Sequence, residues 1–216
     1  MKHVFAGLAF LLLALPAFST DTPTNEAIGD ETSESRNLIG RYLLMDANGR
    51  AVSHEDFPAY FQLISFGYTF CPDICPTTLA EMAAVIGQLG VKSERLQALF
   101  ITIDPERDSA TVLRTYTAFF HPRILGLTGS PELVRRAADN FKVRYEVVRE
   151  PGTPADQYAV DHSAGMYLLG PDGRYIRKFA YGKAPAEIAT QIGEIMASIT
   201  STDDRRPTWR RRPVGD

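Results

Sequence analysis

Both cysteines of the chain lie in one short segment that could bind a metal ion or form a disulfide. Cys71 and Cys75 are four residues apart in "SFGYTFCPDICPTT", and each is followed by a proline. On one turn of helix, residues at this spacing share a face, with Cβ atoms about 5–6 Å apart, so that both sulfurs can reach one ion. A disulfide needs Cβ atoms about 3.8 Å apart and is within reach if the turn unwinds. The spacing alone therefore allows both uses and favours neither.

A third metal donor is expected from a histidine, because two thiolates rarely hold a metal alone. The chain has four histidines, of which His3 lies in the N-terminal apolar segment. His54 and His121 are expected at an ordinary surface or helix-capping position, whereas His162 lies in "VDHSAG", in a loop before a strand that can neighbour the cysteine strand. The alternative is a loop histidine that is hydrogen-bonded to its surroundings. The adjacent Asp161 could orient the imidazole or bind backbone in a turn.

Two thiolates and one imidazole indicate copper as the metal. Soft sulfur ligands suit Cu(I), and a blue copper centre would need two His, one Cys and a weak Met. Structural zinc usually has four protein ligands, and the chain offers no good fourth. We therefore expect Cys71, Cys75 and His162 to bind copper, with Cys71 and Cys75 also able to act as a redox-active pair. A helix N-terminus beside them is expected to stabilise the thiolates.

The elements that position these residues predict an α/β fold. Strands are expected at residues 39–45, 61–66, 96–103, 124–127, 145–148, 166–169 and 175–179, with a hairpin turn at Asn48-Gly49 and a loop over residues 150–165. Helices are expected from Pro76 to Leu89, over residues 112–120 and 131–141, and from Pro185 onward. This order predicts a thioredoxin-like fold with a mixed central sheet flanked by helices and an N-terminal β-hairpin. Cys71 then follows the end of a buried strand, where such sheets gather ligands.

Three segments outside this domain have their own composition. Residues 1–19 have a lysine, an apolar run and small residues, which is typical of a signal peptide, with an uncleaved membrane anchor as the alternative. Residues 20–36 are polar and acidic and are expected to be a flexible spacer. The domain is expected to span residues 37–200. Residues 201–216 carry five Arg against three Asp and are expected to be a disordered basic tail, although the arginines could contact anionic lipid.

The composition limits the classes of function. The 216 residues are 44% hydrophobic and 23% charged, an ordinary mix for one globular domain. Two cysteines are too few for a disulfide scaffold, so the pair is expected to be chemical rather than structural. The net charge of −3 argues against nucleic acid as the main partner.

Three motifs together resemble the Sco/SenC family, the thioredoxin-like copper chaperones of cytochrome c oxidase assembly. They are "GYTFCPDICPTTLAEM", "ITIDPERD" and "VDHSAGMYLLGPDG", and the resemblance covers about residues 37–200. It implies that Cys71, Cys75 and His162 bind Cu(I) or Cu(II). It also implies delivery of copper to the binuclear site of oxidase subunit II, and many members of the family have a membrane anchor or lipid attachment.

These expectations give a metallochaperone rather than an enzyme as the first hypothesis. It would be exported to the bacterial periplasm, at the outer face of the inner membrane if it is membrane-associated, and would meet subunit II and a copper donor protein or thiol reductant. The second hypothesis is a thiol-disulfide oxidoreductase that reduces the cysteines of the oxidase copper site. The CxxxC spacing and the absence of proline in "YAVDHSAGM" disfavour it. A peroxide-reducing thiol enzyme is weaker, because no feature singles out a peroxidatic cysteine. The acidic segment Asp104 to Asp108 could form a lip that guides a partner or supports the site, or a turn followed by a helix N-cap at Asp108 or Ser109, and the turn and cap are favoured for Asp108.

Overall fold

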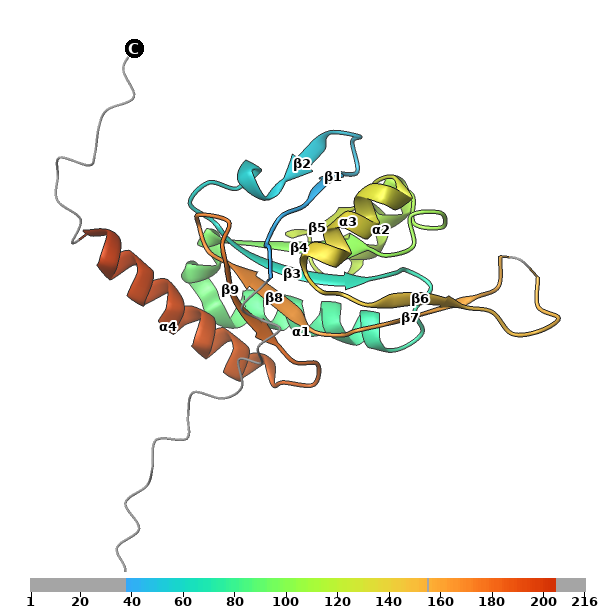
Figure 1. The fold of residues 1–216 in the computed structure, drawn as a ribbon. Coiled ribbons are helices and arrows are strands. Elements are labelled where there is room, and N and C mark those ends of the chain that lie inside the picture. Colours follow the sequence, from blue (N-terminus) through green and yellow to red (C-terminus); the bar gives the residue numbers. More distant parts are fainter. Residues whose placement is uncertain (1–37, 155, 205–216) are drawn as a thin grey trace, which may run out of the picture. The chain divides into compact units, whose positions relative to one another are not determined.

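A five-stranded mixed sheet forms the centre of the domain in the computed structural model, which describes residues 38–154 and 156–204 (Figure 1). The elements in chain order are β1 (Leu43–Met45), β2 (Ala51–Ser53), the 3₁₀-helix η2 (His54–Asp56), β3 (Phe61–Gly67), α1 (Ile74–Leu89), the 3₁₀-helix η3 (Gly90–Arg95), β4 (Leu96–Thr102), α2 (Ala110–Phe120), β5 (Ile124–Leu127), α3 (Pro131–Asn140), β6 (Tyr145–Val148), β7 (Ala159–His162), β8 (Met166–Leu169), β9 (Tyr175–Phe179) and α4 (Pro185–Asp204). The predictions for residues 1–36 and for tail residues 205–216 lie outside the described residues, but α4 extends to Asp204, so residues 201–204 are helical and not part of a disordered tail as predicted.

The strand order in the main sheet is β5-β4-β3-β8-β9. β3 runs parallel to β4, and β4 parallel to β5, whereas β8 pairs antiparallel with both β3 and β9. All seven residues of β3 are buried, as expected for a central strand covered on both faces. The predicted parallel part and the C-terminal antiparallel hairpin are therefore confirmed, as is the hairpin of β1 and β2.

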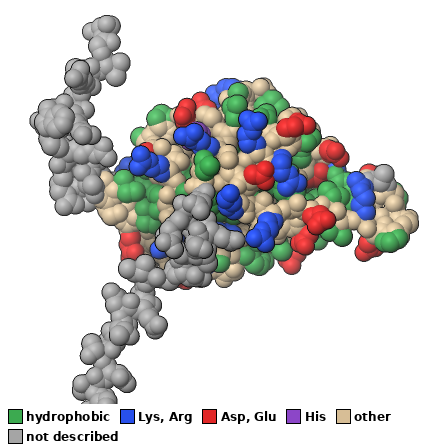
Figure 2. All heavy atoms as spheres, viewed as in Figure 1, with side chains coloured by type: hydrophobic (Ala, Val, Ile, Leu, Met, Phe, Trp, Pro, Cys, Tyr) green, Lys and Arg blue, Asp and Glu red, His purple; other side chains and the backbone are tan. Residues whose placement is uncertain are grey.

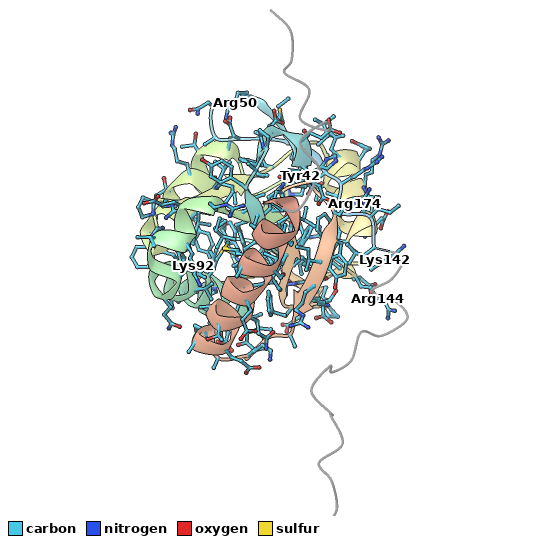
Figure 3. The ribbon with its side chains drawn as sticks, turned by 90° about the vertical axis from the view of Figure 1, so that its left-hand side faces the viewer. Tyr42, Arg50, Lys92, Lys142, Arg144 and Arg174 are labelled. Carbon is cyan, nitrogen blue, oxygen red and sulfur yellow. The ribbon has the colours of Figure 1, made fainter. Side chains whose placement is uncertain are left out.

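Helices cover both faces of this sheet. On one face, Leu113 of α2 packs against Gly126 of β5, and α1 lies beside α4 (Figure 1). Lys92, labelled in Figure 3, follows α1 and packs against α4: its Nζ lies 3.3 Å from the place that a Cβ atom built on Gly193 would occupy. On the opposite face, Phe141 after α3 lies 5.4 Å from the ring of Tyr167 on β8. In the described chain, one helical stretch is long and apolar enough to cross a membrane. It is α1 together with η3, from Ile74 to Arg95, and the buried residues of α1 form part of the core.

Three predictions about where helices, strands and loops begin or end are wrong in detail. The first helix begins at Ile74 rather than at Pro76, so that Cys75 belongs to its first turn. The strand expected from residue 39 begins at Leu43. Residues 150–165 are not all loop, because β7 occupies Ala159–His162 and pairs antiparallel with β6. The β6–β7 hairpin is a two-stranded sheet of its own, separate from the main sheet.

Candidate metal centre

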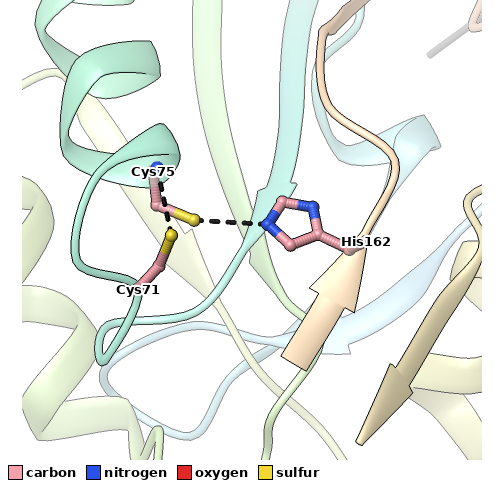
Figure 4. Close-up of side chains that lie close together, drawn as sticks. All are labelled: Cys71, Cys75 and His162. Atoms are coloured by element: carbon pink, nitrogen blue, oxygen red, sulfur yellow. Dashed lines mark hydrogen bonds between the residues drawn. The ribbon is translucent and has the colours of Figure 1, made fainter. Parts of the chain in front are cut away.

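Cys71, Cys75 and His162 converge at the carboxyl end of β3 (Figure 4). One ligand atom from each of them lies within 4.8 Å of the other two, and the Cys75 sulfur lies 3.5 Å from Nε2 of His162. Within the described part of the chain, these residues form the one group of three His, Cys, Asp or Glu side chains placed to share a metal ion. The predicted juxtaposition of the cysteine segment with His162, which lies 87 positions beyond Cys75, is therefore confirmed.

The two cysteines are held differently. Cys71 lies in the loop after β3 and is partly exposed, while Cys75 is 2% exposed. The backbone N–H of Cys75 donates to the Cys71 sulfur at 3.4 Å, and both residues are free thiols. The helix N-terminus does not leave Cys75 acidic as expected, because burial raises the pKa of its thiol well above the ordinary range. Binding of a metal ion to this sulfur would release the thiol proton.

A glycine makes room for the buried sulfur. Gly67 is the last residue of β3, and a Cβ atom built on it would lie 2.6 Å from the Cys75 sulfur and 2.8 Å from the ring of Phe100. Carbon atoms ordinarily pack about 3.5–4.0 Å apart, so no larger residue fits without displacing the sulfur. This residue was missed by sequence reasoning, although "FGY" directly before the cysteine loop carries the glycine that could have suggested a close approach.

Backbone groups orient the imidazole. Nδ1 of His162 lies 3.1 Å from the carbonyl oxygen of Ser163, which leaves Nε2 facing the sulfur of Cys75. Asp161 is exposed, so the backbone of Ser163 takes the orienting position that sequence analysis offered to Asp161 as one of two roles. His162 is the last residue of β7 rather than part of a loop, and its main-chain position is set by the hairpin register that pairs it with Tyr145.

The carboxylate of Asp108 holds the start of the cysteine loop through hydrogen bonds to Thr69. Its buried carboxylate accepts hydrogen bonds from the backbone N–H of Thr69 at 3.0 Å, from the Thr69 hydroxyl at 2.5 Å and from the Thr102 hydroxyl at 2.7 Å. Burial raises the pKa of Asp108, and these hydrogen bonds act in the opposite direction. The helix-capping role falls to Ser109, whose hydroxyl accepts from the N–H of Val112. The predicted turn, closed by the Asp108 N–H that donates to the carbonyl oxygen of Asp104 at 2.9 Å, and the cap at Ser109 are therefore present, whereas a cap at Asp108 is wrong because its carboxylate is buried in the core.

The other histidines of the described chain lie apart from this centre. Nδ1 of His121 accepts from the N–H of Arg123 after α2, which is the capping position expected for it. His54 packs edge-on against Tyr42, with the two ring centroids 6.2 Å apart. The group of side chains placed to share a metal ion therefore contains His162 and neither His54 nor His121.

The chain is similar to known proteins over most of its length. The family model described as SCO1/SenC matches residues 30–197. The chain is 37% identical over 164 residues to the mitochondrial SCO2 homolog of Bos taurus, covering 75% of this chain and 61% of that protein. It is 36% identical over 185 residues to the SCO2-like protein of Rickettsia felis, covering 84% and 87%. The crystal structure of Arabidopsis thaliana ScoI with copper bound superposes with a TM-score of 0.69 at 30% identity, covering 74% of this chain and 99% of that one.

Proposed function

This chain belongs to the SCO1/SenC family, and from that premise we propose that it is a copper chaperone that binds Cu(I) or Cu(II) through Cys71, Cys75 and His162. We propose further that it delivers the ion to the binuclear copper site of cytochrome c oxidase subunit II during oxidase assembly. The observation that carries the proposal is the convergence of two thiols and one imidazole within 4.8 Å. Soft sulfur donors with one imidazole are a donor set that suits copper.

The unequal exposure of the cysteines gives a direction to the transfer. The sulfur of Cys75 is buried beside Gly67 and Phe100, whereas Cys71 is partly exposed in its loop. An incoming thiolate of the acceptor can therefore reach the ion from the side of Cys71, and Cys71 is the first ligand to be exchanged. Three protein donors also leave a coordination position free for the acceptor. Cys75 and His162 would hold the ion until the acceptor supplies its second ligand.

The proposed location follows the same premise. We expect an exported protein that works in the bacterial periplasm, with residues 1–19 as signal peptide or membrane anchor and residues 20–36 as spacer. Its proposed partners are subunit II and either a copper donor protein or a thiol reductant. Basic and acidic side chains are interspersed on the face shown in Figure 2, a pattern that suits a protein partner better than a nucleic acid.

A thiol-disulfide oxidoreductase is the second candidate function. It is favoured by the contact between the Cys75 N–H and the Cys71 sulfur, which holds the two residues close together. In that reaction the two thiols would give two electrons and two protons to a disulfide of the partner and would close on each other. The CxxxC spacing and the absence of proline in "YAVDHSAGM" disfavour it.

The deciding experiment is Cu(I) retention by the purified chain in competition with a chromogenic chelator. His162→Ala should lose affinity, while His121→Ala, the matched control in a capping position, should bind as the wild type does. If His162→Ala retains Cu(I) as tightly as the wild type, the three-donor site is wrong. Copper delivery that survives in Cys75→Ser, together with loss of disulfide exchange, would instead favour the reductant.

A further inference from the structure

The third donor is carried by an element that the main sheet does not hold. Among the strands of the described chain, β6 and β7 pair with each other and with no strand of the five-stranded sheet. Figure 1 shows the hairpin extending away from that sheet, and most of its residues are exposed. Cys75, by contrast, lies in α1 against the core. The distance from His162 to Cys75 therefore depends on the three residues that join β7 to β8 and on side chains that tie the hairpin to the cysteine segment.

Tyr68 makes the first of these ties. It lies three residues before Cys71, and its hydroxyl accepts a hydrogen bond from the backbone N–H of Val160 on β7 at 3.2 Å. Its ring stands at 81° to the imidazole of His162, with the centroids 6.1 Å apart. Tyr68 is 3% exposed, so the contact is shielded from water. The residue that leads into the cysteine loop thus also touches the strand that presents the histidine.

Arg107 and Tyr158 make the second tie. The guanidinium carbon of Arg107 lies 3.5 Å from the ring centroid of Tyr158, and Nη1 donates to the carbonyl oxygen of Tyr158 at 3.0 Å. The Tyr158 hydroxyl donates to Oδ1 of Asp104 at 2.8 Å, and Oδ2 of the same carboxylate accepts from Nε of Arg107 at 2.5 Å. The base of β7 is therefore clamped to the loop after β4 by a closed ring of three side chains.

The same guanidinium also reaches the cysteine loop. Its central carbon lies 4.7 Å from the ring of Phe70 and 5.7 Å from the ring of Tyr68. The side chain of Arg107 is only 13% exposed, although it carries a full charge. One arginine thus contacts the aromatic residues that precede Cys71 and the hairpin that carries His162. A planar guanidinium can stack on rings and donate at its edge at the same time, which an ammonium group cannot.

We infer that Arg107 and Tyr158 are positioning residues of the copper site, which hold the β6–β7 hairpin where Nε2 of His162 reaches the Cys75 sulfur. The inference rests on the proposed function and adds to it how the third ligand is kept in place. Residues that orient a metal ligand typically change metal affinity by about 10–100-fold when they are replaced. Neither residue is one of the three donors, so an effect that passes through His162 should disappear once His162 is alanine, whereas an effect that passes through Cys71 or through the fold as a whole should remain.

A double-mutant cycle with His162 tests the inference, since coupling energies reveal shared action. Cu(I) affinity would be measured by chelator competition for the wild type, Arg107→Gln, Tyr158→Ala and His162→Ala, and for each of the first two combined with His162→Ala. We expect Arg107→Gln and Tyr158→Ala each to lose about 10–100-fold, and to lose nothing further once His162 is alanine. Arg107→Lys should not restore affinity. Arg177→Gln is the matched control, because Arg177 donates to Gln191 on α4 and should bind copper as the wild type does.

A second measurement needs no metal. Amide hydrogen exchange at Val160 in the copper-free protein should become faster in Arg107→Gln and in Tyr158→Ala, and should stay unchanged in Arg177→Gln. Tyr158→Ala covers the case in which Arg107→Gln fails to fold.

Two results would overturn the inference while leaving the copper site intact. One is an equal loss of affinity with and without His162, which would mean general loosening or an effect through the cysteine loop. The other is wild-type affinity in both variants, which would mean that other contacts hold the hairpin, such as the Val160–Tyr68 hydrogen bond and the Arg135 guanidinium 3.6 Å from the Tyr145 ring on β6. If His162→Ala itself binds Cu(I) as the wild type does, the proposed three-donor site fails, and the positioning role fails with it.

Discussion

Replacing Gly67 with alanine should displace the Cys75 sulfur and weaken both the fold and the copper site. The added methyl group would lie 2.6 Å from that sulfur and 2.8 Å from the ring of Phe100. Because carbon contacts are favourable at about 3.5–4.0 Å, the sulfur has to retreat by about 1 Å. Overpacking of this kind in a core costs about 1–3 kcal/mol of unfolding free energy. A shift of about 1 Å is also nearly half the length of a metal–thiolate bond of about 2.3 Å.

Urea unfolding of the copper-free protein and Cu(I) competition would measure the two effects separately. We expect a lower urea midpoint for Gly67→Ala and a copper affinity at least about tenfold weaker, which corresponds to about 1.4 kcal/mol. The matched control is Gly87→Ala in α1, where an added methyl group meets no atom within 4 Å. That change should stabilise the helix by about 0.5–1 kcal/mol and leave copper binding unaltered. A Gly67→Ala protein with the wild-type midpoint and affinity would refute this reasoning.

Three further predictions concern the same region. Asp108→Ala should lower the free energy of unfolding by about 3 kcal/mol, because it leaves the partly buried donors of Thr69 and the buried hydroxyl of Thr102 without an acceptor; an unchanged urea midpoint would contradict this. The pKa of Cys75 is raised above its ordinary 9.0, so the stabilising effect of the protonated thiol is complete below that pH and is lost as the pH rises through the folded-state pKa. Thermal melts above about pH 9 should therefore fall more steeply for the wild type than for Cys75→Ala, and parallel curves would show that the thiol is not responsible. As a copper ligand, Cys75 would release its proton when copper binds. The loss of this one proton should make Cu(I) affinity fall about tenfold for each pH unit of acidification, and a pH-independent affinity would mean that Cys75 is not a ligand.

The donor set and the fold could be predicted from the sequence because both depend on strong local signals. Soft and imidazole donors are few in this chain, and the buried strands β3 and β4 are continuous apolar runs bounded by turn residues. The strand alternation then places the end of β3 opposite the segment before β8, which brings His162 to the cysteines.

The supporting residues could not be predicted because their roles depend on packing between distant segments. β7 has one buried residue among four, so its pattern does not differ from that of a polar loop. Asp108 satisfies the rules for a turn or cap equally well, and the hydroxyl of Thr69 that binds it lies 39 positions away. The helix start at Ile74 was missed because Pro76, a typical first helical residue, occupies the third position of α1.

The separation of the donors along the chain gives a bound ion a mechanical consequence. An ion shared by Cys75 and His162 joins residues 87 positions apart, and so acts as a removable cross-link between the core and the hairpin. A permanent bond that closes a loop of this size lowers the entropy of the unfolded chain by an amount worth about 4–5 kcal/mol. Copper-loaded protein should therefore melt at a higher temperature than copper-free protein, and release of the ion would return the protein to its less stable form. Resistance to heat or to proteolysis would then report how much of the protein still carries its cargo.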